Sequence, residues 1–424
     1  MDKLIISVLL VFLPFSAFSQ RTIRDTSFYS PSLDETRHLQ VYLPDGYRSS
    51  ADRYPVVYFL HGGFMRHTDY GSIYNSLDLL IQYGRVSPMI IVKPDGRAGP
   101  WELSWWASSE LYGDMETYIV EDLVEFVDGA YRTQADPGKR AIMGHSMGGF
   151  GAMRLALLHS DKFRGVASLS GGLDLSRWPD WVPSILSENG GSPPYTYNPF
   201  AGSWTQAVGF AMAGAFSANL SNSPHQVDFP LDGQGNIIAA TFDRWMEQSP
   251  CHLAAQLPQS AELAIYFDCG DADPSGVYPW NVSFSDSLDT LGIPHEFQSY
   301  SGGHMNQLDG RYNVSLDFLE AAMTQTTGIE EDTRGEPESF LLQQNYPNPF
   351  NPSTTIEYEL PEPSYINLTV HNVIGQEVAT IAAGEWPVGT FRTSWDATGF
   401  PSGMYLYRLK AGGFVSTKTM LFVR

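Results

Sequence analysis

The sequence is poor in cysteine and in basic residues. Its 424 residues include only two cysteines, Cys251 and Cys269, which excludes a fold held together by several disulfides. A single bridge and two buried thiols are equally good interpretations of this pair. The formal net charge is −22, from 25 basic and 47 acidic residues. Because no long acidic run carries this charge, it indicates solubility and argues against nucleic acid or an anionic membrane surface as a partner.

Long hydrophobic runs are also missing, apart from one at the N-terminus. Lys3 precedes an apolar run at 4–15, and Ala17-Phe18-Ser19 offers small residues for cleavage before Gln20. This layout is typical of a secretory signal peptide at residues 1–19, so we expect the mature chain to start at Gln20. The run is too short to span a bilayer comfortably, and no cysteine at the cleavage point could take a lipid. The sequence therefore predicts export without stable membrane insertion.

Apolar residues are plentiful enough for large cores. Hydrophobic residues make up 43% of the chain and aromatic residues 13%, and the length favours one large domain plus a smaller one. From residue 20 to 328, short apolar runs alternate with longer amphipathic ones. This alternation predicts an α/β domain with a mostly parallel sheet and crossover helices. The expected strands are 38–43, 55–60, 88–92, 140–143, 165–169, 263–268 and 296–300.

One expected helix stands out by its periodicity. Met115, Ile119, Leu123, Phe126 and Ala130 recur at helical spacing between the third and fourth of these strands. The spacing predicts an amphipathic helix whose apolar side faces the core.

Between residues 174 and 248 the pattern gives way to a stretch rich in proline, glycine, asparagine and aromatic residues. We expect a lid or an irregular insertion here. Its aromatic side chains could bind an acyl group or a sugar, or could fill the gap between insertion and core, and the sequence favours neither. They are Trp178, Trp181, Tyr195, Tyr197, Phe200 and Trp204.

The rest of this domain is organised around the segment 140–159, where an apolar strand breaks into Gly-His-Ser-Met-Gly at 144–148 and passes directly into a helix. A serine between two near glycines suits a sharp strand-to-helix turn that lifts its hydroxyl clear of the sheet. We interpret Ser146 as a nucleophile, against the alternative of a glycine-tightened turn. The Met147 N–H, at the start of the helix, would stabilise an oxygen that develops negative charge.

A glycine pair follows the expected strand 55–60. Gly62 and Gly63 let backbone amides face a pocket, and the Gly63 N–H is the candidate for a second oxyanion donor. His61 precedes Ser146 in the chain and lies at the strand end, so we assign it a structural role. Three tryptophans after the third strand either line the same site or pack in the core. These are Trp101, Trp105 and Trp106.

A serine nucleophile needs a histidine base and an acid that orients the base, in the chain order serine, acid, histidine in α/β-hydrolases. Of the histidines after Ser146, only His304 lies in a glycine-rich loop directly after a strand, so His304 is the expected base. Histidine suits this task because its ordinary pKa lies near neutrality. Three acids compete: Asp268 is still on the preceding strand and could pair within it, Asp271 follows, and Asp273 lies in the loop beyond the turn glycine.

Six motifs, in this order, resemble the esterase D family of α/β-hydrolases over about residues 35–325. They are VYLPDGY at 41–47, LHGG at 60–63, PDG at 94–96, GHSMGG at 144–149, CGDAD at 269–273 and GGH at 302–304. The family includes feruloyl and acetylxylan esterases, S-formylglutathione hydrolases, enterochelin esterases and mycolyltransferases. The resemblance implies an α/β-hydrolase fold, and it implies that Asp273 is the acid, because the family's acid ends a Cys-Gly-x-x-Asp segment. The aromatic insertion departs from the compact members.

The activity that this resemblance implies is hydrolysis of carboxylic esters through an acyl-enzyme. Ser146 would attack the carbonyl, His304 would act as base and then acid, Asp273 would orient His304, and the amides of Met147 and Gly63 would bind the oxyanion. No metal or organic cofactor is implied. The expected substrate is a feruloyl or acetyl ester on plant cell-wall polysaccharide, by analogy. The alternatives are an acyltransferase of the same family and a non-catalytic surface protein that binds carbohydrate.

The C-terminal part differs in character. Residues 329–337 are charged and poor in apolar residues, which indicates a linker, and residues 338–424 carry short alternating runs between turn residues, which predict a small β-sandwich. A carbohydrate-binding module would fit this pattern. However, QNYPNPFNP at 344–352, NVIGQ at 372–376 and PSGMY at 401–405 resemble the C-terminal sorting domain of type IX secretion cargo. This resemblance implies recognition by the secretion machinery, passage through the outer membrane and removal of the tail.

Overall fold

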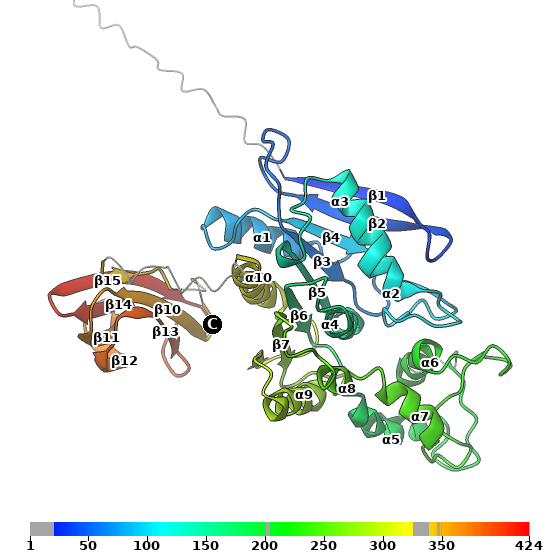
Figure 1. Ribbon diagram of the computed structural model, residues 1–424. Helices are drawn as coiled ribbons and strands as arrows, with labels where there is room; N and C mark the ends of the chain where they lie inside the picture. Colours follow the sequence, from blue (N-terminus) through cyan, green and yellow to red (C-terminus); the bar gives the residue numbers. More distant parts are fainter. Residues whose placement is uncertain (1–20, 201–203, 325–338, 346–347, 349, 424) are drawn as a thin grey trace, which may run out of the picture. The chain divides into compact units, whose positions relative to one another are not determined.

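The computed structural model describes residues 21–200, 204–324, 339–345, 348 and 350–423. It divides into two compact units, Met1–Thr327 and Gly328–Arg424 (Figure 1). The expected signal peptide at 1–19 and linker at 329–337 lie outside the described residues, so both stay predictions. Within the described ranges, no helix has both the length and the apolar character needed to cross a membrane.

The first unit is built on one sheet. Its strands are β1 (Thr22–Ser30), β2 (Glu35–Leu43), β3 (Val56–Leu60), β4 (Ile90–Pro94), β5 (Arg140–His145), β6 (Gly165–Leu169), β7 (Ala264–Gly270) and β8 (Glu296–Tyr300). They lie in the order β1-β2-β4-β3-β5-β6-β7-β8. β2 pairs antiparallel with β1 and β4, and the other neighbours are parallel. All seven expected strands are present, so the prediction of a mostly parallel sheet is confirmed.

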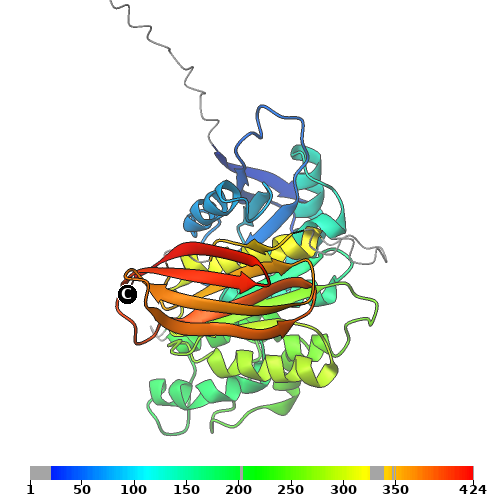
Figure 2. The ribbon, with the colours of Figure 1, turned by 90° about the vertical axis from the view of Figure 1, so that its left-hand side faces the viewer.

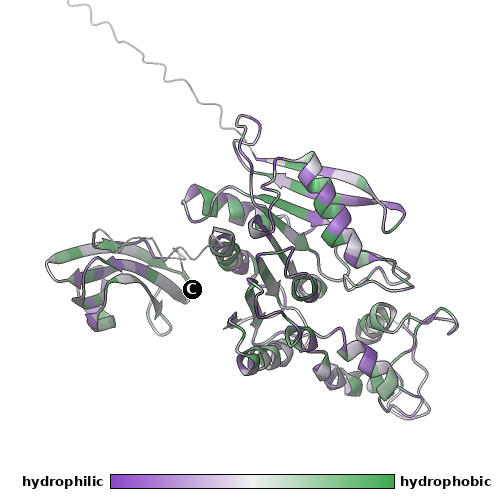
Figure 3. Cartoon of the chain, viewed as in Figure 1, coloured by the Kyte–Doolittle hydropathy of each residue, from purple (hydrophilic) through white to green (hydrophobic). Residues whose placement is uncertain are grey.

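Helices cover both faces of this sheet. α1 (Ser72–Gln82) and α10 (Leu308–Thr324) pack together on one face, while α4 (Met147–Leu158), α8 (Pro250–Ala254) and α9 (Tyr278–Leu291) lie on the other (Figure 1). Every residue of β3 to β6 is buried as a result. This is why apolar residues follow one another in these strands without alternation, as in VVYFL of β3 and IIV at the start of β4; Figure 3 colours the chain by hydropathy.

The helix expected at 115–130 is present, with one irregularity. α2 (Met115–Thr117) and α3 (Val124–Ala130) are joined by a π-helical segment, Tyr118–Leu123. A π-helical turn holds more residues than an α-helical turn, so the buried side advances beyond it. Consequently Val127 is buried, whereas Phe126 is half-buried and Ala130 is exposed.

An ionic cluster fixes α4 against α2. Arg154 of α4 is buried and its guanidinium lies 2.8 Å from the Glu116 carboxylate, which also lies 2.7 Å from Nε2 of His159. The hydrogen bond with His159, followed by the charge of Arg154, outweighs burial and lowers the pKa of Glu116 to about 2. The cluster therefore keeps Glu116 ionised as the partner of a buried cation.

We expect Glu116→Gln to destabilise the fold by about 1–3 kcal/mol at neutral pH, because Arg154 loses its charged partner; the value allows for the partial exposure of Glu116. The pKa of Glu116 is lower in the folded chain than in the unfolded chain, where it is about 4.3. Its interactions therefore stabilise the fold fully only at pH values above about 4.3. The difference between wild type and variant should therefore shrink as pH falls from about 4 towards about 2. Urea unfolding across this range measures it, and a difference independent of pH would contradict the assignment.

The insertion at 174–248 is more regular than expected, so the prediction of an irregular segment is wrong in part. It contains a 3₁₀ segment, Leu175–Trp181, and the helices α5 (Val182–Glu188), α6 (Trp204–Phe216) and α7 (Ala239–Met246). Almost all of α6 is buried. A helix that is apolar on every side has no amphipathic period, which explains why periodicity missed it.

Both cysteines are free. Sγ of Cys251 lies 3.7 Å from the Leu173 carbonyl oxygen, and Sγ of Cys269 lies 3.7 Å from the Asp273 carboxylate. Burial raises the pKa of Cys251 to about 12 and raises that of Cys269 further. Of the two interpretations offered by the sequence, the structure has no bridge but two free thiols, of which Cys269 is buried and Cys251 is half-buried.

The second unit consists of two antiparallel sheets. Its strands are β9 (Leu341–Leu342), β10 (Ser353–Leu360), β11 (Ser364–Asn372), β12 (Glu377–Trp386), β13 (Gly389–Asp396), β14 (Gly403–Ala411) and β15 (Phe414–Phe422). One sheet has the order β13-β10-β9 and the other β12-β11-β14-β15; Figure 2 shows the long strands broadside. Side chains of both sheets, such as Tyr358 and Tyr407, share one buried core. The expected β-sandwich is confirmed.

Candidate active site

Ser146 lies at the turn between β5 and α4. Its φ of 57° and ψ of −120° are strained for a residue with a side chain and cost about 1–3 kcal/mol. The Ser146 N–H donates to the Leu169 carbonyl of β6 at 2.8 Å, and the Ser146 carbonyl accepts from Phe150 at 2.9 Å. The strand before and the helix after thus hold the turn, and the Ser146 side chain lines a pocket.

Close backbone approach explains the glycines beside Ser146. A Cβ on Gly148 would lie 2.0 Å from the Leu60 carbonyl oxygen, and a Cβ on Gly144 would lie 2.3 Å from the carbonyl oxygen of Gly148. Main-chain atoms cannot move aside as a flexible side chain could. Glycine at both positions therefore lets α4 start directly against the end of β3.

We expect Gly148→Ala to destabilise the first unit by more than about 4 kcal/mol, or to give little soluble protein. Gly129 on α3 is a matched control, because a Cβ there would have nothing within 4 Å, and Gly129→Ala should stabilise by about 0.4–1 kcal/mol. Denaturant unfolding of both variants measures the contrast. Equal stability of the two would show that the turn can open without cost.

His304 follows β8 and Asp273 follows β7, so neighbouring parallel strands bring them to one edge of the sheet. Nδ1 of His304 lies 2.7 Å from Oδ2 of Asp273. Because an ionised carboxylate can only accept, Nδ1–H donates and Nε2 is left to accept a proton. Burial alone would raise the pKa of Asp273, but hydrogen bonds from His304 and Ser275 hold it below its usual value. Asp273 is therefore an anion at neutral pH.

The two competing acids have other partners. Asp268 is fully buried and lies 2.8 Å from the Arg311 guanidinium, and it accepts from the Tyr266 hydroxyl at 2.8 Å. Asp271 accepts from the Gly302 N–H at 3.2 Å. Of the three candidates from the sequence, the structure brings Asp273 to His304.

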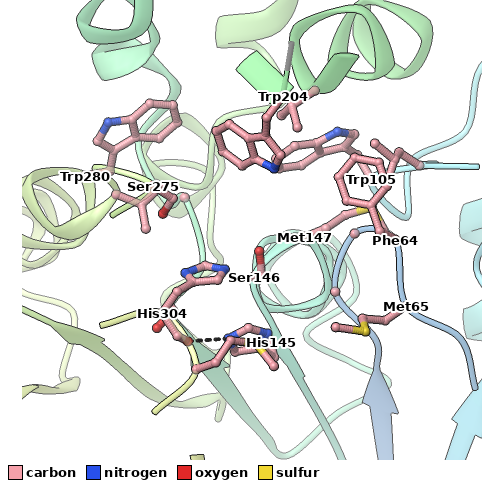
Figure 4. A pocket seen from close by; sticks show the side chains of 18 of the residues that line it. Phe64, Met65, Trp105, His145, Ser146, Met147, Trp204, Ser275, Trp280 and His304 are labelled. Carbon is pink, nitrogen blue, oxygen red and sulfur yellow. Dashed lines mark hydrogen bonds between the residues drawn. The ribbon is translucent and has the colours of Figure 1, made fainter. Parts of the chain in front are cut away.

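Ser146, His304, Gly63 and Met147 line a single cavity of about 170 Å³. Figure 4 shows the Ser146 hydroxyl and the His304 ring facing the same space, with tryptophan side chains above them. Four tryptophans contribute to its wall: Trp105, Trp181, Trp204 and Trp280. Since a single water needs only about 10–15 Å³ by this kind of measure, the cavity has room for an organic group of many atoms.

Several other residues chosen from the sequence have structural roles. Nε2 of His61 accepts from the Gly96 N–H at 2.9 Å, and its ring packs on Trp106. Trp101 packs on Phe210, so of the three tryptophans after β4 only Trp105 lines the pocket. Within the described ranges, no group of three or more His, Cys, Asp or Glu side chains could hold a metal ion.

Backbone strain is concentrated around this cavity. Nine non-glycine residues of the described chain have a φ between 50° and 62°, and five of them line the pocket. These are Phe64, Tyr70, Trp105, Ser146 and Ser170. Strain persists where surrounding structure imposes it, and it gathers at sites that bind or react.

Several residues that line the pocket were not predicted from the sequence. Trp280 lies on α9, and Tyr70 and Met305 lie in loops; none of them has a local sequence signal, because their role depends on tertiary contacts. His145 did have a signal, since it precedes the nucleophile candidate directly. It is buried and lines the pocket beside Ser146.

The first unit is similar to known proteins that bear esterase names. A solved ferulic acid esterase superposes with a TM-score of 0.53 at 21% identity, covering 72% of this chain and 99% of that protein. This likeness shows the fold, an α/β-hydrolase sheet with its helices. An endo-1,4-beta-xylanase/feruloyl esterase of Xylanibacter ruminicola is 29% identical over 157 residues, which are 35% of this chain and 22% of that protein.

An esterase of Mycobacterium tuberculosis is 28% identical over 296 residues, 67% of this chain. The chain spans 56% of the length of that relative. Residues 344–423 match the secretion system C-terminal sorting domain family, which confirms the resemblance of the tail to secretion cargo. Residues 30–308 match the Esterase family, and the chain belongs to this family.

Proposed function

We propose that the protein is a serine carboxylester hydrolase. Ser146 attacks the ester carbonyl, Nε2 of His304 takes the serine proton and returns it to the leaving alcohol, and Asp273 holds the histidine tautomer. The amides of Gly63 and Met147 bind the oxyanion. Water then attacks the acyl-enzyme with His304 again as base. The observation that carries this proposal is the 2.7 Å contact between His304 and Asp273 at the edge of a pocket that also contains the strained Ser146.

The substrate we propose is a feruloyl or acetyl ester of plant cell-wall polysaccharide. Tryptophan walls and a cavity of about 170 Å³ favour the flat aromatic acyl group over acetyl. The relative from Xylanibacter ruminicola bears a feruloyl esterase name, which supports the same choice by analogy.

A panel of feruloyl, acetyl and plain aryl esters tests this proposal. We expect the feruloyl ester to have the highest kcat/KM, with free acid as the product even when sugar is added as an acceptor. Transfer of the acyl group to sugar would indicate an acyltransferase. An absence of turnover on every ester would support a non-catalytic binding protein.

The sorting domain supports export, and we propose that the signal peptide takes the chain to the periplasm and that the tail then directs it through the outer membrane. The tail would contact the secretion machinery and be removed.

A protein of residues 20–329 should be soluble and hydrolyse small esters at the rate of the full chain, because the candidate residues all lie in the first unit, which has its own core. The same truncation in the native host should leave the enzyme in the periplasm. Activity assays on cell fractions check both results. Unchanged secretion would refute the sorting role, and binding of the isolated tail to xylan would support a carbohydrate module.

A further inference from the structure

A chain of hydrogen bonds runs along the wall of the pocket, through two lining residues that the proposed mechanism does not use. The Tyr70 hydroxyl lies 3.2 Å from the Gly62 nitrogen and 3.0 Å from Nδ1 of His145. Nε2 of His145 lies 2.8 Å from the carbonyl oxygen of His304, the contact drawn as a dashed line in Figure 4. These contacts link three segments that are far apart in the sequence.

The partners determine the direction of every bond. The His304 carbonyl can only accept, so Nε2 of His145 carries a proton and donates it. Burial, followed by the nearby charge of His304, lowers the pKa of His145 to about 3, so the ring is neutral and its Nδ1 accepts. Tyr70 must then donate to Nδ1, and its oxygen accepts from the Gly62 N–H. Burial raises the pKa of Tyr70 and keeps this hydroxyl protonated.

The geometry around Gly62 is tight. A Cβ there would lie 2.6 Å from the Tyr70 hydroxyl and 3.3 Å from Nδ1 of His145. Tyr70 itself has a φ of 60°, in the strained left-handed region. Strain and close contact together indicate that the surrounding structure forces this hydroxyl between the two loops.

We propose that Tyr70 and His145 are positioning residues that hold the oxyanion donor and the base at fixed distances from the nucleophile. The inference rests on the proposed function. Gly62 is followed by Gly63, His145 is followed by Ser146, and His145 fixes the main chain of His304. The His145 side chain, next to Ser146 in the chain, thus orients both the loop that carries Gly63 and the loop that carries His304.

The neutral state of His145 matters for the same reason. Its ring centroid lies 4.7 Å from that of His304. When His304 takes the serine proton, a charged neighbour at this distance would oppose it, whereas a neutral ring does not. His145 can therefore support His304 from below without disfavouring the imidazolium that the reaction needs.

Tyr70→Phe tests the first link. The ring keeps its contact with Phe59, but the Gly62 N–H and Nδ1 of His145 lose their partner. We expect kcat to fall on the order of tenfold to a hundredfold with KM within about twofold, because misplacement of reacting groups costs rate more than binding. Tyr312→Phe is the matched control: Tyr312 also packs on Phe59, and among the described residues its buried hydroxyl has no hydrogen-bond partner. Its kcat should be unchanged.

His145→Gln and His145→Leu test the second link. The glutamine amide can still donate to the His304 carbonyl, whereas leucine has similar bulk and no donor. Glutamine should therefore recover much of the rate that leucine loses. Residues that serve only to stabilise the fold would instead shift the unfolding temperature, with the kcat of the folded protein unchanged.

The rate at which a fluorophosphonate labels Ser146 tests the proposed function and the positioning role separately. Loss of labelling in His304→Ala would support the proposed function. A labelling rate lowered on the order of tenfold in Tyr70→Phe and in His145→Leu would support the positioning role. Wild-type labelling rates in both of these variants, or equal rates for glutamine and leucine at position 145, would overturn the positioning role alone. An unlabelled wild type would overturn the proposed function.

Discussion

Replacing Ser146 with alanine is expected to lower kcat for ester hydrolysis by at least about 10⁴-fold, and His304→Ala is expected to do the same. The double variant should be little worse than either single one, because nucleophile and base act as one unit and their losses do not add. Ser146→Ala removes the attacking oxygen but keeps the Cβ at the strained turn, so the fold should be intact.

Initial rates on a feruloyl ester, with circular dichroism as a check of folding, measure these losses. Ser170→Ala is a suitable control, because Ser170 lines the same pocket with a similar positive φ of 50°, and its hydroxyl lies 3.5 Å from the Tyr300 hydroxyl. Its loss of rate should be far smaller. Activity of Ser146→Ala close to that of wild type would end the triad hypothesis.

The strand-to-helix turn at Ser146 and the presence of seven strands could be predicted from the sequence because their signals are local. The glycines beside Ser146 reflect a close approach of main chains, and the buried strands reflect helices on both faces. A short motif contains all the information needed for such features.

Other features depend on contacts that no local pattern records. β1 has mostly exposed or half-buried residues and thus no apolar period, and α6 is apolar on every side. Trp280 reaches the pocket from α9 only because the chain returns there. The residues around the three acids left the choice among them open for the same reason, until the family resemblance pointed to Asp273. What distinguishes the acids in the structure is the 2.7 Å contact between Asp273 and His304, whereas Asp268 pairs with Arg311.

Asp273, the proposed acid, is the residue whose substitution is most informative. Asp273→Asn is expected to lower kcat on the order of 10³- to 10⁴-fold, with a small change in KM. Asp273 accepts a hydrogen bond from Nδ1–H of His304 at 2.7 Å. An asparagine amide can instead donate to Nδ1, which moves the ring proton to Nε2, where it blocks the approach of the serine proton. The fold should survive, because asparagine has nearly the same shape.

The neighbouring acids supply matched controls for this last prediction. Asp271→Asn should keep nearly all activity, since Asp271 only accepts from the Gly302 N–H. Asp268→Asn should leave the kcat of the folded protein nearly unchanged but destabilise it by about 3–5 kcal/mol, because the Arg311 guanidinium, on a side chain that is only 12% exposed, loses its counter-charge. Steady-state kinetics and urea unfolding of the three variants separate lost catalysis from lost stability. If Asp271→Asn with an intact fold lost more activity than Asp273→Asn, the acid would be Asp271, and the contact between Asp273 and His304 would be structural only.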